Sequence, residues 1–254
     1  MITYMSSDRR FIVTILAGGE GKRMRTTVPK VLCHFRGKPM IIRILKEVLG
    51  LQPDKIFIVV GKYKDQIKYT IESEIYNENT IEYIDQPNPQ GTGDAIRCCL
   101  PYYLETDRIM ILNGDMPCIK HSFLERVLMQ TSINSCIIVT ARVDDPYGYG
   151  RIECNNDDEF RRIIEETDCS LEQKKINRIN TGIYVIRGSI LISNIPAIKD
   201  IQNVKKEYYL TDVFAEHKKY SNIPIHLYEI SQNNNWMIQG VNTPEELEKA
   251  EKGI

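Results

Sequence analysis

The sequence predicts an α/β protein with a mostly parallel central sheet, helices on both of its faces and a smaller antiparallel part. Two patterns support this prediction. Short apolar runs rich in β-branched residues alternate with segments whose apolar residues recur every three or four positions. A glycine-rich loop follows directly on the first apolar run. The length of 254 residues allows one large core, and we expect a single domain.

The first half of the chain combines four segments of strand length with three of helical periodicity. The strands are expected at 11–17, 55–60, 80–84 and 108–113, and the helices at 39–49, 64–75 and 93–104. Strands that are separated by helices form βαβ units, and such units make parallel sheets with right-handed crossovers.

The pattern changes after about residue 130. Extended segments are expected at 135–143, 149–154, 159–166 and 179–186, and turns and polar stretches separate them, which indicates an antiparallel or mixed part. A helix at 207–220, a strand at 223–230 and a final helix should follow. Thr243 is the expected N-cap of the final helix, with Pro244 at its first position and Glu246 three residues after the cap. The chain shows no repeat or linker.

Charge and composition exclude several classes of protein. With 33 basic and 34 acidic residues, the net charge of −1 argues against a partner that is a nucleic acid or a membrane surface. The apolar run at 11–17 is too short for a signal peptide, and no run approaches the ~18 apolar residues of a membrane span. Seven cysteines form no CxxC pair and leave an odd one over. We therefore expect a cytoplasmic protein with free thiols.

The loop after the first predicted strand contains Gly18, Gly19 and Gly21. Its backbone amides should emerge at the carboxyl edge of the sheet, where open α/β folds bind ligands. Glycines let the main chain approach phosphate groups closely. The loop is not a Walker A motif, and Met24 stands where a dinucleotide-binding loop has its last glycine. Conventional P-loop NTPases and dinucleotide dehydrogenases are therefore disfavoured.

The segment from Lys22 to Lys38 carries six lysines or arginines and no acidic residue. A charge run alone is usually a solvated loop, but this one adjoins a glycine loop at a strand end. The combination favours a polyphosphate ligand. Arg23 and Lys30 are the best candidates to neutralise its charge.

Asp115 follows the fourth predicted strand on the same edge of the sheet. An aspartate at this place is a reasonable ligand for Mg²⁺, which takes one or two protein oxygens at nucleotide sites. Asn-Gly-Asp is also typical of a turn, and Asn242 before the final helix has the same two interpretations. Basic residues, backbone amides and Mg²⁺ suit phosphoryl or nucleotidyl transfer. If the nucleophile is itself a phosphate, it is already largely ionised and needs no general base, so no histidine is assigned a catalytic role.

Several motifs together resemble a known enzyme family. LAGGEGKRM (16–24) with PKVL (29–32) resembles the signature of sugar-nucleotide pyrophosphorylases. Seven further motifs, in order, are similar to the uridyltransferase domain of the bacterial bifunctional N-acetylglucosamine-1-phosphate uridyltransferases. They are QPNPQGTGDAI (86–96), LNGDMP (112–117), DDPYGYGRI (144–152), IIEETD (163–168), INTGIYV (179–185), EYYLTDV (207–213) and GVNTPEEL (240–247). The resemblance spans residues 11–250 and implies a Rossmann-like nucleotidyltransferase fold.

The resemblance also implies a reaction, in which UTP and N-acetylglucosamine 1-phosphate give UDP-N-acetylglucosamine and pyrophosphate. It places the nucleotide on the half at about 11–130 and the sugar on the half at about 131–254. Arg23 and Lys30 would be catalytic, and Asp115 and Asn242 would hold Mg²⁺. The implied nucleotide-binding residues are Leu16, Ala17, Gly18, Gly19, Gln86, Gly91 and Thr92. The implied sugar-binding residues are Gly150, Glu165, Asn180, Tyr209 and Thr211.

The sequence departs from the family at some positions. Gly18, Glu20 and Lys22 stand where Ala, Lys and Thr are common, Asn113 where Tyr is common, and Asp94 where His is frequent. These departures leave open a pyrophosphorylase for another sugar 1-phosphate or nucleotide, such as glucose 1-phosphate or dTTP. A non-catalytic subunit that binds nucleotide sugars is a further alternative. The chain ends at Ile254 without the family's acetyltransferase β-helix, so we expect uridyltransferase activity alone.

Overall fold

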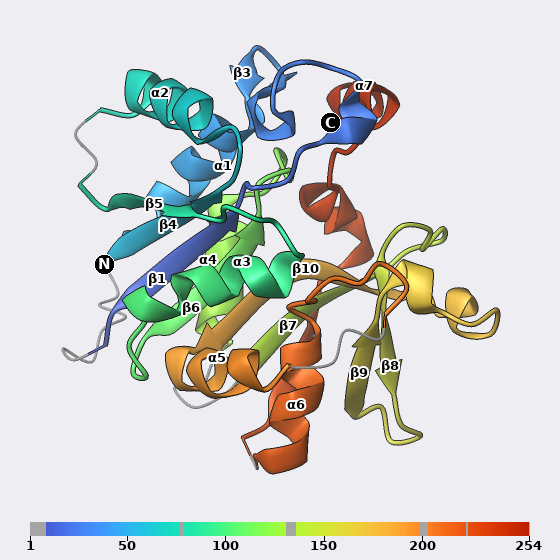
Figure 1. The fold of residues 1–254 in the computed structure, drawn as a ribbon. Coiled ribbons are helices and arrows are strands. Elements are labelled where there is room, and N and C mark those ends of the chain that lie inside the picture. The colour runs from blue at the N-terminus through green and yellow to red at the C-terminus, as the bar shows by residue number, and fades with distance from the viewer. Residues whose placement is uncertain (1–8, 77–78, 131–135, 199–202, 222, 254) are drawn as a thin grey trace.

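The computed structural model describes residues 9–76, 79–130, 136–198, 203–221 and 223–253. These residues form three layers, with a central sheet between two layers of helices (Figure 1). The α/β class predicted from the sequence is confirmed, and so is the mostly parallel central sheet.

Seven strands build the body of the sheet, in the order β11-β7-β10-β6-β1-β4-β5. Their bounds are β1 Phe11–Leu16, β4 Lys55–Val60, β5 Ile81–Asp85, β6 Arg108–Asn113, β7 Cys136–Arg142, β10 Arg178–Arg187 and β11 Ile225–Glu229. Strands β6, β1, β4 and β5 are parallel neighbours, and β11 is parallel to β7. Strand β10 is antiparallel to both β6 and β7. One hydrogen-bonded sheet therefore joins the two halves of the chain.

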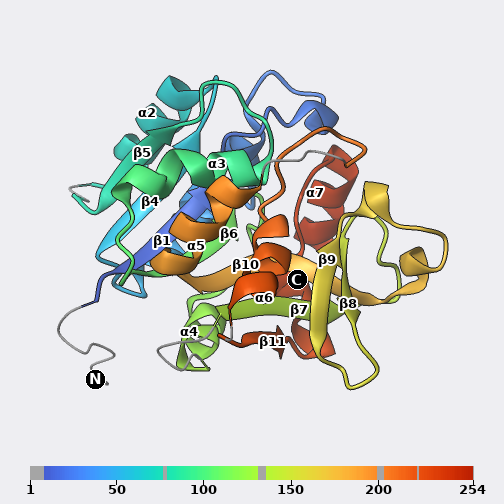
Figure 2. The same ribbon diagram turned by 60° about the horizontal axis from the view of Figure 1, so that its bottom comes forward.

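Four further strands lie outside this order. Strands β8 (Gly150–Cys154) and β9 (Phe160–Ile164) form an antiparallel hairpin that pairs with the start of β10 and projects from the sheet (Figure 2). Strands β2 (His34–Phe35) and β3 (Lys38–Pro39) form a separate two-stranded sheet. The hairpin is the smaller antiparallel part that the sequence predicts.

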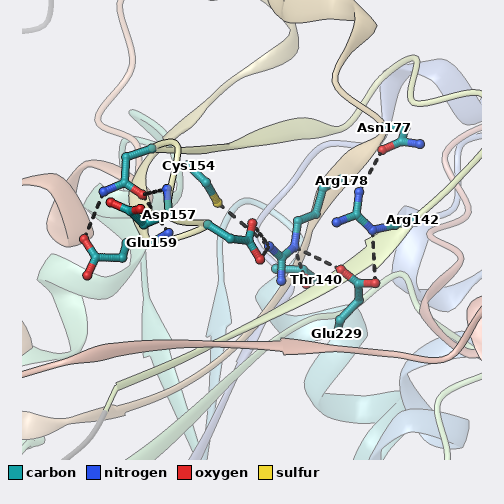
Figure 3. A network of polar contacts seen from close by, with 10 residues as sticks. Thr140, Arg142, Cys154, Asp157, Glu159, Asn177, Arg178 and Glu229 are labelled. Atoms are coloured by element: carbon teal, nitrogen blue, oxygen red, sulfur yellow. Dashed lines mark hydrogen bonds and ion pairs between the residues drawn. The ribbon is translucent and has the colours of Figure 1, made fainter.

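Arg178 fixes the tip of this hairpin to the sheet, as Figure 3 shows. Its Nη1 nitrogen donates to Asp158 at the tip, at 3.1 Å, and its Nε lies 3.1 Å from a carboxylate oxygen of Glu229 on β11. The side chain is largely buried between these two carboxylates, so its charge is paired on both sides.

Helices cover both faces of the sheet. Their bounds are α1 Met40–Leu49, α2 Lys64–Glu74, α3 Thr92–Cys99, α4 His121–Met129, α5 Gly188–Asn194, α6 Asp212–Tyr220 and α7 Pro244–Lys252. Core residues of α1, α2 and α4 pack against one face, and those of α3, α5 and α6 against the other. Ile12 of β1 joins the second core, and its neighbour Val13 joins the first. Because successive side chains point to opposite faces, strands covered on both sides are apolar throughout.

Short 3₁₀ segments complete the secondary structure of the described residues, and two predicted helices have different bounds in the structure. The 3₁₀ segments are Lys22–Met24, Lys30–Leu32, Leu100–Tyr102, Glu166–Asp168, Gln173–Lys175, Ile195–Ala197 and Gln232–Ile238. The helix expected at 93–104 ends at Cys99, because Pro101 lacks the amide that would continue it. The helix expected at 207–220 begins only at Asp212. Before it, the amide of Tyr208 donates to Gln90, and the carbonyl of Tyr208 accepts from Gly93, so this backbone already has partners.

The final helix α7 begins as the sequence predicts. The side chain of Thr243 accepts a hydrogen bond from the amide of Glu246 at 3.1 Å, and Pro244 is the first helical residue. Ala250 of α7 packs in a third, smaller core with Met24, Phe35 and Met40. The last helix is thereby held against the segment that follows β1 (Figure 1).

Two predictions about composition can be compared with the described residues. Within them, no helix is both long and apolar enough to cross a membrane. The seven cysteines all lie in the described part of the chain, and each of them is a free thiol there.

Candidate functional site

A cavity of about 230 Å³ opens where β1 and β6 end, and we call it the main cavity. Its wall combines Leu16 and Asp115 from the first half of the chain with Glu165, Asn180 and Thr211 from the second. A second hollow of about 280 Å³, the glycine-loop hollow, is lined by Gly19, Glu20, Gly21, Lys22, Arg23, Lys30 and Asn242. Arg23 and Asn242 line both spaces. The two spaces therefore adjoin at the carboxyl edge of the sheet.

Four predicted residues meet at this junction. The ammonium of Lys30 donates to a carboxylate oxygen of Asp115 at 2.5 Å and to the amide oxygen of Asn242 at 2.9 Å. Arg23 donates to the same amide oxygen at 3.1 Å. The side chains of Lys30 and Asp115 are each 16% exposed, so this charge pair is only weakly screened by solvent.

The donor set fits a divalent cation with few protein ligands. The described residues contain no group of three or more His, Cys, Asp and Glu side chains that could hold a metal ion. However, oxygens of Asp115 and Asn242 already converge on one cationic nitrogen, that of Lys30. Mg²⁺ at nucleotide sites takes one or two protein oxygens and completes its octahedron with phosphates and water.

Contacts that involve the backbone position three of these four residues, Lys30, Asp115 and Asn242. Gly21 has φ +63°, and a β-carbon there would lie 2.5 Å from the β-carbon of Lys30, so only glycine fits. The amide of Val241 donates to the carbonyl of Asp115 at 2.9 Å. The carboxylate of Glu246, on the first turn of α7, accepts from the amide of Asn242 at 2.6 Å. The start of the last helix thus positions Asn242 beside Asp115.

The other predicted nucleotide-binding residues divide into two groups. Leu16 and Thr92 line the main cavity, and Gly19 lines the glycine-loop hollow. Ala17, Gly18, Gln86 and Gly91 line neither space. The side-chain carboxamide of Gln86 donates to the carbonyl of Gly91 at 3.1 Å and to the carboxylate of Asp94 at 2.8 Å. Gly18 packs against the same side chain. Gln86 thus connects the glycine loop with the start of α3.

The predicted sugar-binding residues lie mostly on the opposite wall of the main cavity. The hydroxyl of Thr211 donates to the carboxylate of Glu165 at 2.8 Å. The side-chain carboxamide of Asn180 donates to the hydroxyl of Tyr184 at 2.7 Å. Burial raises the pKa of Glu165, and the hydrogen bond from Thr211 opposes this shift. Gly150 pairs with Asn180 in the sheet and also lines the cavity. Tyr209 is buried outside it.

The chain matches the model of the MobA-like NTP transferase domain over residues 13–219. It belongs to this family. The sequence-based prediction of a nucleotidyltransferase is thereby confirmed, since the matched range covers most of the chain. The range contains Arg23, Lys30 and Asp115, and Asn242 lies beyond it.

Curated relatives of this NTP transferase are similar over long ranges. A protein of Acanthamoeba polyphaga mimivirus, named "Probable UDP-N-acetylglucosamine pyrophosphorylase", is 42% identical over 252 residues, which is 96% of each chain. The bifunctional protein GlmU of Nostoc sp. is 37% identical over 209 residues, which is 81% of this chain and 45% of that protein. This NTP transferase therefore spans about half the length of the GlmU relatives.

Solved structures confirm the fold. A Bacillus anthracis protein assigned as a glucose-1-phosphate thymidylyltransferase, in complex with a sucrose, superposes with a TM-score of 0.70. It is 22% identical, and the match covers 95% of this chain and 94% of that one. HddC from Yersinia pseudotuberculosis, complexed with GMP-PN, gives a TM-score of 0.68 at 19% identity, covering 95% and 98%. At this identity the likeness concerns the fold alone.

The structure also identifies supporting residues that the sequence did not predict. Arg151 on β8 is almost fully buried, and its guanidinium lies 2.8 Å from Glu166. Glu166 accepts from the amide of Gly148 at 3.2 Å, and Arg151 donates to the carbonyl of Tyr149. Gly148 and Tyr149 both line the main cavity. The one signal in the sequence is an arginine directly after the last glycine of the DDPYGYGRI motif.

We expect Arg151→Met to lower the free energy of unfolding by about 3 kcal/mol, because it leaves Glu166 without its buried partner. Urea denaturation measures this loss. Arg162→Met is the matched control, because Arg162 pairs with Glu153 on the same hairpin but is about half exposed. The control should lose no more than about 1 kcal/mol. Equal losses in the two variants would contradict a structural role for the buried pair.

A pH-dependent effect on stability is expected from Asp212, which follows Thr211. Burial raises the pKa of Asp212 to about 6, and the charges of Glu165 and Asp168 act in the same direction. An aspartate in an unfolded chain has a pKa of about 3.9. Because the folded state binds this proton more tightly, Asp212 stabilises the fold at pH 4, and that contribution is lost as the pH rises through about 6.

We therefore expect Asp212→Asn to gain stability relative to the natural chain at pH 7 and much less at pH 4. Urea denaturation at both pH values checks this, with Asp157→Asn in the exposed β8–β9 turn as the control. A difference that is the same at both pH values would show that Asp212 titrates normally in the folded protein.

Proposed function

We propose that this NTP transferase catalyses uridylyl transfer from UTP to N-acetylglucosamine 1-phosphate, giving UDP-N-acetylglucosamine and pyrophosphate. The observation that supports it most directly is the convergence of Arg23, Lys30, Asp115 and Asn242 at the junction of two adjoining spaces. The choice of substrates rests on the name of the mimivirus relative, which is 42% identical over nearly the whole chain. It also agrees with the family resemblance of the motifs in this sequence.

In the proposed reaction, an oxygen of the sugar phosphate attacks the α-phosphorus of UTP. The bond from that phosphorus to the bridging oxygen breaks, and pyrophosphate leaves with the electron pair. Arg23 and Lys30 stabilise the charge that develops on the triphosphate, because their cationic groups already lie at the glycine-loop hollow. The attacking phosphate is mostly ionised near pH 7, so no side chain has to remove a proton.

Asp115 and Asn242 are the residues that would hold Mg²⁺, which would neutralise charge on the phosphates. The glycine-loop hollow then takes the triphosphate, and the uridine lies along Leu16, Gly19 and Thr92. The other residues assigned to the nucleotide, Ala17, Gly18, Gln86 and Gly91, support this wall from behind. The sugar lies against Gly150, Glu165, Asn180 and Thr211, with Tyr209 supporting that wall from behind. This assigns nucleotide binding to residues 11–130 and sugar binding to residues 131–254. The seven free thiols suit a reducing cytoplasm.

The decisive experiment measures pyrophosphate release over a matrix of nucleoside triphosphates and sugar 1-phosphates, with Mg²⁺ or with a chelator. We expect the highest kcat/KM with UTP and N-acetylglucosamine 1-phosphate, and loss of release with the chelator. Preference for dTTP or glucose 1-phosphate would reassign the substrates within the same reaction class. No release with any pair would reject the enzyme and favour a subunit that only binds nucleotide sugars.

A further inference from the structure

The last residue of β6, Asn113, occupies a particular place in the main cavity. Its backbone pairs with Leu16 at the end of β1, and Asp115 follows two residues later. Its side chain reaches across to β10, where a β-carbon on Gly182 would lie 2.3 Å from the amide nitrogen of Asn113. Gly182 has φ +78°, so glycine both permits the backbone and leaves room for the carboxamide. Asn113 thus lies between the two walls of the cavity.

The other polar side chains around it are already paired. Asp115 accepts from Lys30, Glu165 accepts from Thr211, and Asn180 donates to Tyr184. Among the residues that the structure describes, none forms a hydrogen bond with the carboxamide of Asn113, which lines the cavity and is half-buried. A carboxamide offers two donor hydrogens and an acceptor oxygen. In the open cavity these groups face solvent, and a ligand that displaces this solvent has to satisfy them in its place.

The geometry points to Asn113 as a specificity-determining residue whose carboxamide binds a hydroxyl group of a bound substrate. This inference rests on the proposed function. The carboxamide is neutral, whereas the phosphate groups have cationic partners at Arg23 and Lys30. A neutral group that can both donate and accept matches a hydroxyl, which does the same. Both substrates carry hydroxyl groups: the nucleotide carries them on its ribose, and the sugar phosphate carries them on its ring.

The test combines a variant with substrates that lack one hydroxyl. Asn113→Leu keeps the approximate size of the side chain and removes its hydrogen bonds. With the complete substrates we expect kcat/KM to fall by about tenfold, the size of one neutral hydrogen bond to a ligand. The same comparison is made with 2′-deoxy-UTP and 3′-deoxy-UTP, and with N-acetylglucosamine 1-phosphates that lack the hydroxyl at C3, C4 or C6.

We expect the tenfold loss to disappear with one of these deoxy substrates, because that substrate lacks the hydroxyl that Asn113 binds in the natural chain. A deoxynucleotide that abolishes the loss would identify a ribose hydroxyl, and a deoxysugar would identify a sugar hydroxyl. Both results support the inference. A loss of the same size with every substrate, or no loss with the complete pair, would overturn it.

Two controls separate this result from a general defect. Asn177→Leu changes an exposed asparagine outside the main cavity, and its kcat/KM should equal that of the natural chain. Thermal unfolding reports whether Asn113→Leu folds. If it does not, Asn113→Ser takes its place, and its relative activity on complete and deoxy substrates must still differ from that of the natural chain.

Failure of the proposed function has a different signature. If the natural chain releases no pyrophosphate with any pair, the proposed reaction is rejected. The binding of UDP-N-acetylglucosamine by the natural chain and by Asn113→Leu is then compared by calorimetry. An approximately tenfold weaker affinity of the variant would support the contact, and equal affinities would reject it.

Discussion

Asp115→Ala is expected to lower kcat by about a thousandfold or more, while the protein still folds. The carboxylate of Asp115 lies 2.5 Å from the ammonium of Lys30, at the point where the glycine-loop hollow meets the main cavity. If it holds Mg²⁺, its removal forfeits several kcal/mol of charge stabilisation in the transition state. About 4 kcal/mol corresponds to three orders of magnitude in rate.

Pyrophosphate release at saturating substrate and Mg²⁺ measures this effect, and thermal unfolding confirms that the variant is folded. Asp157→Ala is the matched control, because Asp157 is exposed in the β8–β9 turn, and it should keep the kcat of the natural chain. Turnover of Asp115→Ala within tenfold of the natural chain would remove Asp115 from the metal site.

The second large effect is expected from Lys30→Ala, which should lower kcat by about a hundred- to a thousandfold. The ammonium of Lys30 is mostly buried and already points into the junction, so it is organised for charge that develops during the reaction. Lys30→Arg should recover only part of the activity, because a planar guanidinium cannot contact Asp115 and Asn242 in the same way as a compact ammonium.

Separate values of kcat and KM decide what Lys30 does. A fall in kcat indicates stabilisation of the transition state, whereas a rise in KM alone would mean that Lys30 only binds the ground state. Lys22→Ala is the control, because Lys22 lines the same hollow but is 86% exposed and pairs with Glu20. Its effect should not exceed about fivefold.

The strands of the central sheet could be predicted because helices cover both faces of that sheet. Strands that are buried on both sides are continuous apolar runs in the sequence. Helices were harder. Neither α4 nor α5 was predicted, and the helix expected from residue 207 begins at Asp212. At 207–211, hydrogen bonds from a distant segment, 90–93, replace those of a helix. Such pairing depends on tertiary contacts, which local periodicity does not contain.

The sequence indicated the polar side chains that meet at the junction of the two spaces, but not the residues that support them. Arg23, Lys30, Asp115 and Asn242 were all predicted, and they lie within hydrogen-bond distance of one another in a connected set. The roles of Glu246 and Arg151 were not predicted. Glu246 was recognised only as part of a helix cap, yet its carboxylate reaches the backbone of Asn242. A glutamate three residues after a helix N-cap can complete the cap or position a neighbouring residue of the site, and only the fold shows which of these it does.

The contact between Arg23 and Asn242 joins positions that are 219 residues apart in the chain. During synthesis, the glycine loop and Asp115 leave the ribosome long before Asn242 and the first turn of α7 do. A nascent chain can thus build most of its sheet while the cluster of Arg23, Lys30 and Asp115 still lacks the side chain of Asn242. The cluster is therefore complete only once residue 242 and the first turn of α7 have been synthesised and have folded onto the earlier part of the chain.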